Sequence, residues 1–242
     1  MLAIEPLNTS YDEEEVIRAI SHALNEFYMS LTKTLDDINI DKILKRKNPY
    51  LYRAKGINNA TQVVDGILSA YVSSSEETIF GNTFFEPIAI VVSGGQKAVT
   101  EGVDITVDKD NTIYSIAVKS GTSVFNADSR KRQEQNFQSA QKRAQQAHKA
   151  FMPVVGYGYG KKKVSIKNEK FYKELAGKDF WEWLTGDPAF YTMGTKPDEF
   201  ATHFEDSYNK AENRMIRDFT TKYCKDDGSI DWDKLIKFNS GD

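Results

Sequence analysis

Residues 101–121, EGVDITVDKDNTIYSIAVKSG, carry the clearest structural pattern in the chain. Apolar and polar residues alternate on both sides of the segment DKDN, whose residue types favour a tight turn. Because side chains in a β-strand point alternately to its two faces, the pattern predicts a hairpin with one apolar face and one polar face. Pairing centred on the turn places Asp104 opposite Ser115 or Ala117, with Lys119 close by.

Asp104 and Lys119 are the first candidates for chemistry, because both lie on the predicted polar face. A carboxylate beside an ammonium suits a divalent metal ion and a phosphate. The alternative is a plain hairpin with a surface ion pair, which the alternation by itself favours. Three further features favour a functional site. The strand ends sharply at Ser120 and Gly121, a strongly basic segment follows, and a predicted helix with an acidic residue precedes the hairpin.

Hydrophobic periodicity predicts an α/β fold around this hairpin. Apolar stripes predict helices over residues 12–34, 36–45, 58–72, 171–184, 205–224 and 231–238. The segment SSSEE at residues 73–77 resembles a helix start, and this further helix would carry Glu86, bend at Pro87 and end at Gly94. A helix over residues 126–150 and a buried strand over 151–155 predict a right-handed parallel crossover.

The order of Glu86, Asp104 and then the segment AVK ending at Lys119 resembles the core motif of the PD-(D/E)XK nuclease superfamily. In that motif, an acidic residue on a helix, an aspartate on one strand and a (D/E)-x-Lys on the next strand converge. A longer set of segments is similar to type II restriction endonucleases of the ApaLI/PmeII-like group. These segments are NPYLYRAK at residues 48–55, SSEET at 74–78, GG at 94–95, GVD at 102–104 and KSG at 119–121.

The resemblance, which covers residues 48–195, implies both a fold and an activity. The fold is a central mixed sheet flanked by helices, with added N- and C-terminal helices. The activity is Mg²⁺-dependent hydrolysis of phosphodiester bonds in double-stranded DNA at a specific sequence. Asp104, the backbone carbonyl of Val118 and a helix carboxylate would hold the metal, and Lys119 would assist the attacking water. A palindromic target would require a homodimer.

The chain departs from the motif at two positions. Val103 stands where the motif has proline, and Ala117 stands where it has a metal-binding aspartate or glutamate. Alanine offers no oxygen, so either the second carboxylate comes from elsewhere or the protein is a catalytically inactive DNA-binding relative. Glu86 is the first candidate for this carboxylate and Glu134, on the following helix, is the second. Glu101 is the third, since its strand position places it on the face opposite Asp104.

The charge of the chain is distributed unevenly. The net charge is −3, yet residues 128–170 hold eleven basic and three acidic residues, a net charge of +8. Such asymmetry is typical of a phosphate-binding face, although a solvated helix face is the alternative. The residues expected to contact DNA phosphates are Arg130, Lys131, Lys142, Lys161, Lys162 and Lys163.

Composition argues against several other classes of protein. No apolar run approaches the length of a membrane span, and the N-terminus lacks the pattern of a secretory signal, so a cytoplasmic location without a membrane partner is expected. The single Cys224 rules out an intrachain disulfide and a cysteine-rich zinc site. The histidines, at positions 22, 148 and 203, show no metal-ligand spacing.

The length of 242 residues suits one sizeable domain with additions. Residues 1–56 are expected to form an N-terminal helical region for DNA or subunit contact. Residues 57–242 are expected to form the nuclease core with its C-terminal helices, either as a separate unit or as part of one continuous domain.

Overall fold

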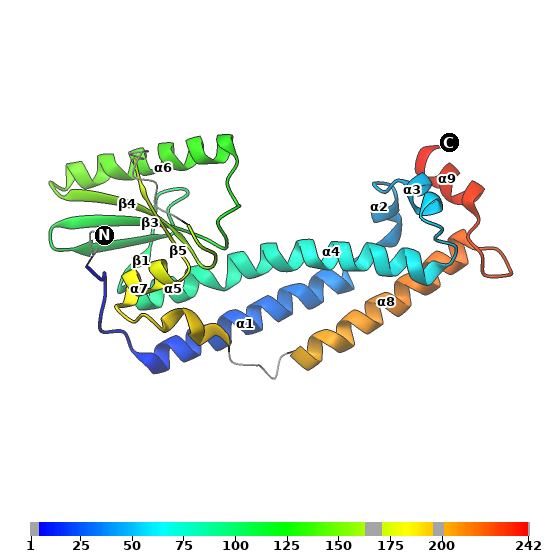
Figure 1. Cartoon of the computed structure of the whole chain (residues 1–242), viewed down its shortest axis with the longest axis horizontal. Helices are drawn as coiled ribbons and strands as arrows, with labels where there is room; N and C mark the ends of the chain where they lie inside the picture. The colour runs from blue at the N-terminus through cyan, green and yellow to red at the C-terminus, as the bar shows by residue number, and fades with distance from the viewer. Residues whose placement is uncertain (1–4, 163–170, 196–200, 242) are drawn as a thin grey trace. The chain divides into compact units, whose positions relative to one another are not determined.

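The computed structural model describes residues 5–162, 171–195 and 201–241. Backbone contacts divide the chain into two compact units, Met1–Phe27 with Phe80–Pro197 and Tyr28–Ile79 with Asp198–Asp242. These units do not follow the expected boundary at residue 56, because the long helices α1 (Glu13–Asp36) and α4 (Ala60–Thr83) each contribute to both. The first unit contains the β-sheet, and the second is helical (Figure 1).

The sheet of the first unit is mixed, with five strands in the order β1-β2-β3-β4-β5. The strands are β1 (Gln96–Lys97), β2 (Ile105–Lys109), β3 (Thr112–Lys119), β4 (Ala150–Tyr157) and β5 (Lys173–Ala176). The first three pair antiparallel, whereas β3 with β4 and β4 with β5 pair parallel. The expected α/β fold with a central mixed sheet flanked by helices is therefore confirmed.

The hairpin of β2 and β3 closes through Asp110 and Asn111, whose φ angles are 48° and 57°. Two successive residues with positive φ form the type I′ turn that matches the twist of paired strands, and Asp and Asn tolerate this conformation better than most residues. The turn sets a register with Ile105 opposite Ile116. One residue further from the turn, the Asp104 N–H also donates to the Ile116 carbonyl, at 2.9 Å, so Asp104 is attached to β3 just before β2 begins.

Helices cover both faces of the sheet (Figure 1). Helix α6 (Ala127–Gln146) lies on one face, and α5 (Phe85–Ser93) and α7 (Lys178–Thr185) lie on the other. Phe137 of α6 packs with Ala117, Val155 and Tyr157 in a buried cluster. The expectation of one polar face is therefore wrong for the second strand, where both faces are buried between Ser115 and Val118.

The expected helix start at residues 73–77 is also wrong, because α4 continues without a break to Thr83. The hydroxyls of Ser75 and Thr78 donate to the carbonyls four residues earlier, so the serine-rich segment lies inside the helix. The interruption comes at Phe84, before α5 begins. Pro87 has no N–H for the Thr83 carbonyl and its ring crowds that carbonyl, which accounts for a break at this point.

The segment 171–184, expected to be one helix, divides into β5 and α7. Gly177 separates them with a φ of 53°, and a Cβ at this position would lie 2.5 Å from the carbonyl oxygen of Gly160. Only glycine accommodates both conditions, so the chain can turn from the sheet edge directly into a helix.

The second unit is built from helices joined by polar contacts. Besides parts of α1 and α4, it contains α2 (Ile40–Leu44), α3 (Pro49–Ala54), α8 (Ala201–Tyr223) and α9 (Trp232–Ser240). Pro49 begins α3 after the Asn48 cap, a position where proline's missing N–H costs no hydrogen bond. The Asn239 side chain of α9 donates to the carbonyls of Leu44 and Lys47, so backbone carbonyls at and after the end of α2 have hydrogen-bond partners. No described helix of either unit combines the length and apolar character of a membrane span.

Phe137→Ala should lower the free energy of unfolding by about 3–5 kcal/mol, because it leaves a cavity between α6 and the sheet. Urea unfolding followed by circular dichroism measures this loss. Gln138→Ala, at the adjacent exposed position of the same helix, is the matched control and should change the free energy by less than about 0.5 kcal/mol. Equal effects of the two substitutions would contradict the packing described for α6.

Candidate active site

Asp104 and Lys119 meet at the end of the hairpin that lies away from the turn. The Lys119 Nζ lies 3.4 Å from the Asp104 Oδ2, as the hairpin pattern predicts. The Lys119 ammonium also donates to the Val118 carbonyl at 3.0 Å, and the Asp104 Oδ2 accepts from the Val118 N–H at 2.6 Å. The side chains of Lys119 and Asp104 are 28% and 20% exposed, so water can reach both.

The backbone around Asp104 is held from both sides. Its N–H donates to β3 at Ile116, and its carbonyl accepts from the Ala98 N–H at 3.0 Å, just after β1. The carboxylate is then oriented by the Val118 N–H. Backbone hydrogen bonds on both sides therefore set the position of Asp104, and the Val118 N–H sets the orientation of its carboxylate.

The turn before Asp104 is fastened to α6 by residues that the sequence analysis did not single out. Gly102 has a φ of 68°, and a Cβ on it would lie 2.0 Å from the Asn136 Nδ2. The Gln133 side chain, which is buried, donates from Nε2 to the Gly102 carbonyl at 2.7 Å. A signal for this role was present in the sequence, since Gln133 lies four residues before Phe137 on the apolar stripe of its helix.

The Lys119 ammonium lies within reach of both the Asp104 carboxylate and the Val118 carbonyl. Two oxygens that converge on one cation form the kind of donor set that Mg²⁺ prefers. Within the described residues, the Asp104 Oδ1 accepts no hydrogen bond and is free for a further cation contact. The residues present therefore fit a divalent metal at this position, although no group of three or more acidic, histidine or cysteine ligands occurs in the described part of the chain.

Ala117 is fully buried against Phe137 and Val155. A carboxylate in its place would be desolvated in this apolar cluster, which gives a physical reason for alanine here. Position 117 therefore supplies no carboxylate, and a second one would have to come from another element.

The three alternative carboxylates have different surroundings. Glu86, in the first turn of α5, forms an ion pair with Lys97 at 3.3 Å. Glu134 is partly buried on α6, next to Gln133, whose side chain holds Gly102. Glu101 pairs with Arg132 at 3.0 Å, and both of these side chains are largely exposed. None of the three is joined directly to Asp104 by a hydrogen bond in the described structure.

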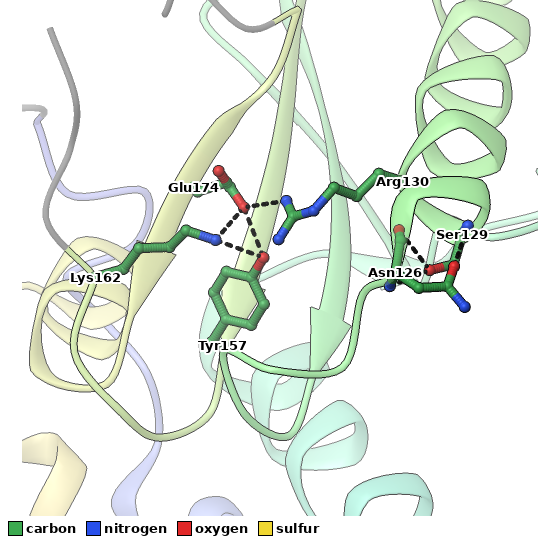
Figure 2. A network of polar contacts seen from close by, with 6 residues as sticks. All are labelled: Asn126, Ser129, Arg130, Tyr157, Lys162 and Glu174. Atoms are coloured by element: carbon green, nitrogen blue, oxygen red, sulfur yellow. Dashed lines mark hydrogen bonds and ion pairs between the residues drawn. The ribbon is translucent and has the colours of Figure 1, made fainter.

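The expected DNA-contacting residues fall into three groups. Arg130 and Lys162 converge on the carboxylate of Glu174 (Figure 2). Exposed positions on α6 and after β4 hold Lys131, Lys142 and Lys161. Lys163 lies outside the described residues. Glu174 was missed in the sequence because the segment around it was expected to be a helix.

Comparison with known proteins identifies the class. Residues 14–203 match the family model of the type II restriction endonuclease EcoO109I. The chain thus belongs to the EcoO109I family of type II restriction endonucleases. The similarity to the ApaLI/PmeII-like group and to the PD-(D/E)XK motif stays a prediction. No curated protein matches the chain.

Gly102→Ala should lower the free energy of unfolding by more than about 1 kcal/mol, because it combines backbone strain with a collision against Asn136. The double variant Gly102→Ala with Asn136→Ala, compared with Asn136→Ala alone, should show a smaller loss, because the collision is gone and only the strain remains. Urea unfolding of the four proteins gives the coupling between the two positions. A coupling of zero would contradict the close approach of α6 to this turn.

Proposed function

We propose that the protein is a Mg²⁺-dependent endonuclease that hydrolyses phosphodiester bonds of double-stranded DNA at a specific sequence. The observation that carries the proposal is the convergence of Asp104, the Val118 carbonyl and Lys119 at the end of β3. Two findings support the proposal together. The chain belongs to a type II restriction endonuclease family, and Asp104, Val118 and Lys119 offer oxygens for a metal ion and a cation for a phosphate.

Each of these groups has a separate role in the proposed reaction. Asp104 and the Val118 carbonyl would hold Mg²⁺, which supplies charge neutralisation at a phosphate oxygen and makes its bound water more acidic. The Val118 N–H fixes the orientation of the Asp104 carboxylate. Lys119 stabilises the negative charge that develops around the phosphorus, and its partial exposure allows it to turn from Asp104 toward the substrate.

Glu86 is the preferred third ligand in this proposal. Its partner Lys97 is 78% exposed, so the ion pair is weak and the carboxylate can exchange it for a metal ion. Lys97 pairs with Ile105, the residue after Asp104, which brings the region of Glu86 near the candidate site. Glu134 is the alternative, since α6 holds the turn that leads to Asp104.

The remaining partners follow from the chemistry of the substrate. Basic residues of α6 and of the segment after β4 would contact the phosphates of duplex DNA, most directly the exposed Lys131, Lys142 and Lys161. A palindromic site would be cut by a homodimer, with one active site for each strand. A cytoplasmic location is consistent with a substrate of cellular or invading DNA.

A second function is favoured by one observation, the alanine at position 117. If neither Glu86 nor Glu134 completes the metal site, the protein is a DNA-binding member of the family without cleavage. Binding of duplex DNA that weakens steeply with salt, without any cut in the presence of Mg²⁺, is the outcome that distinguishes this function.

Asp104→Asn should lower the cleavage rate at least about a hundredfold while changing stability by less than about 1 kcal/mol. The amide keeps an oxygen for the Val118 N–H but loses the charge that would hold the metal. Cleavage of mixed bacteriophage and plasmid DNA is followed on gels over a range of Mg²⁺ concentrations, and the ends are sequenced to find the site. Asp108→Asn, on the following strand and outside this cluster, is the control and should cleave normally. Normal cleavage by Asp104→Asn would remove Asp104 from the site.

The third ligand is tested by Glu86→Gln and Glu134→Gln. We expect Glu86→Gln to need a much higher Mg²⁺ concentration for half-maximal cleavage, because one negative ligand is lost, and Glu134→Gln to cleave as the unmodified protein does. The Mg²⁺ titration of both variants gives the result. The reverse order of effects would assign the ligand to Glu134.

A further inference from the structure

A second polar cluster lies on the same sheet face as Lys119 and Ala117, two strands away from Ala117. Glu174 of β5 pairs with Val155 of β4, and Val155 pairs with Ala117 of β3. Paired residues in adjacent strands share a face of the sheet, so Glu174 faces α6. Its side chain is only 9% exposed, and a buried carboxylate of this kind requires charged or hydrogen-bonding partners.

Three donors converge on the Glu174 Oε1 (Figure 2). The Tyr157 hydroxyl donates to it at 2.7 Å, Arg130 approaches at 3.3 Å, and Lys162 forms an ion pair with the same oxygen. The Lys162 Nζ also lies 3.1 Å from the Tyr157 hydroxyl and 4.6 Å from the centre of its ring. The two cations are therefore held at one point by a carboxylate and a phenol.

The cluster joins three separate segments of the first unit. Arg130 lies in the first turns of α6, which the Asn126–Ser129 capping box holds in place, and Lys162 follows β4 (Figure 2). Burial, reinforced by the hydrogen bond to Glu174, raises the pKa of Tyr157 far above its ordinary value, so the phenol keeps its proton and remains a donor. Neither cation is free to sample many positions, as an isolated surface lysine or arginine would be.

Among the described residues, the cations of the cluster outnumber its carboxylates. Arg130 and Lys162 face the single carboxylate of Glu174 in this part of the chain, and their side chains are 35% and 21% exposed. Tyr157 of β4 pairs with Lys119 of β3, and neighbouring strands lie about 4.8 Å apart. The positive charge around Tyr157 therefore lies one strand further along the sheet than Lys119. An anion that extends past Lys119 along the sheet end would reach it.

We propose that Glu174 is a positioning residue that holds Arg130 and Lys162 as a second phosphate subsite. The ligand is a phosphate of the same DNA strand that flanks the cleaved bond. This inference rests on the proposed function, because Asp104 and Lys119 define the cleaved phosphate. It assigns a role to two of the basic residues that differs from general attraction to DNA, since their positions are fixed before DNA arrives.

The test measures duplex binding against salt concentration, separately from cleavage. Lys162→Gln should reduce the slope of log Kd against log salt by about one and weaken binding by about tenfold. Lys173→Gln is the matched control. It removes the same charge one residue before Glu174, on the opposite face of β5, and should leave both quantities unchanged.

Glu174→Gln distinguishes two roles of this carboxylate, because they predict opposite changes in DNA binding. If Glu174 only neutralises the two cations, its loss frees positive charge and should tighten DNA binding. If it positions them, its loss should weaken binding by about tenfold and reduce the salt slope, although the amide still accepts from Tyr157. Tighter or unchanged binding by a folded Glu174→Gln overturns the positioning role. Should this variant fail to fold, the Lys162→Gln slope alone decides, and an unchanged slope overturns the subsite.

The position of the phosphate is tested with duplexes that carry one uncharged methylphosphonate linkage at a time around the cut site. The linkage next to the cleaved bond should weaken binding of the unmodified protein but not of Lys162→Gln, since the contact is already lost. If DNA is bound with the expected slopes and never cut, the proposed catalysis fails and the phosphate subsite stands. If DNA is cut and Lys162→Gln has a normal slope, the subsite fails and the proposed catalysis stands.

Discussion

The parallel pairing of β3 with β4 is the constraint on which the rest of the first unit depends. It runs the full length of both strands and ends with Lys119 opposite Tyr157. A shift of one residue would turn every side chain of one strand to the other face of the sheet. Such a shift would separate Lys119 from Asp104 or Tyr157 from Glu174. One register, held by burial on both faces of β3, therefore places Lys119 and the second cluster on the same side of the sheet.

Helix α6 makes three different kinds of contact on that side of the sheet. Phe137 fills the space above Ala117, Gln133 holds the turn that leads to Asp104, and Arg130 reaches Glu174. The packing of Phe137 explains why position 117 is apolar, because α6 excludes water from the sheet face beneath it and Ala117 has apolar neighbours there. A carboxylate beneath this helix needs donors around it, and Glu174 has them in Arg130, Lys162 and Tyr157.

The basic segment is less uniform than its composition suggests. Arg132 and Lys149 form ion pairs with Glu101 and Asp108, next to the hairpin strands. The pair of Arg132 is largely exposed and that of Lys149 is partly exposed. Both contribute little to stability, but they leave less charge for DNA than the net charge of the segment implies. The buried Glu174 differs, since Arg130, Lys162 and the Tyr157 hydroxyl all compensate a carboxylate that is largely shielded from water. Charge counted along a sequence therefore overstates a binding surface unless the partners of each residue are known.

Sequence alone determined the hairpin, its turn and the meeting of Asp104 with Lys119, because alternation and turn chemistry are local and the register follows from them. It also determined α6 and β4, whose periodicity is strong, and the nuclease class. Only the tertiary structure decided the rest. The serine-rich segment stays helical within α4, whereas residues 173–176 leave their helical pattern because the edge of β4 offers them backbone partners and Gly177 permits the turn. The roles of Gln133 and Glu174 depend on residues more than ten positions away in the chain, and no local pattern contains that information.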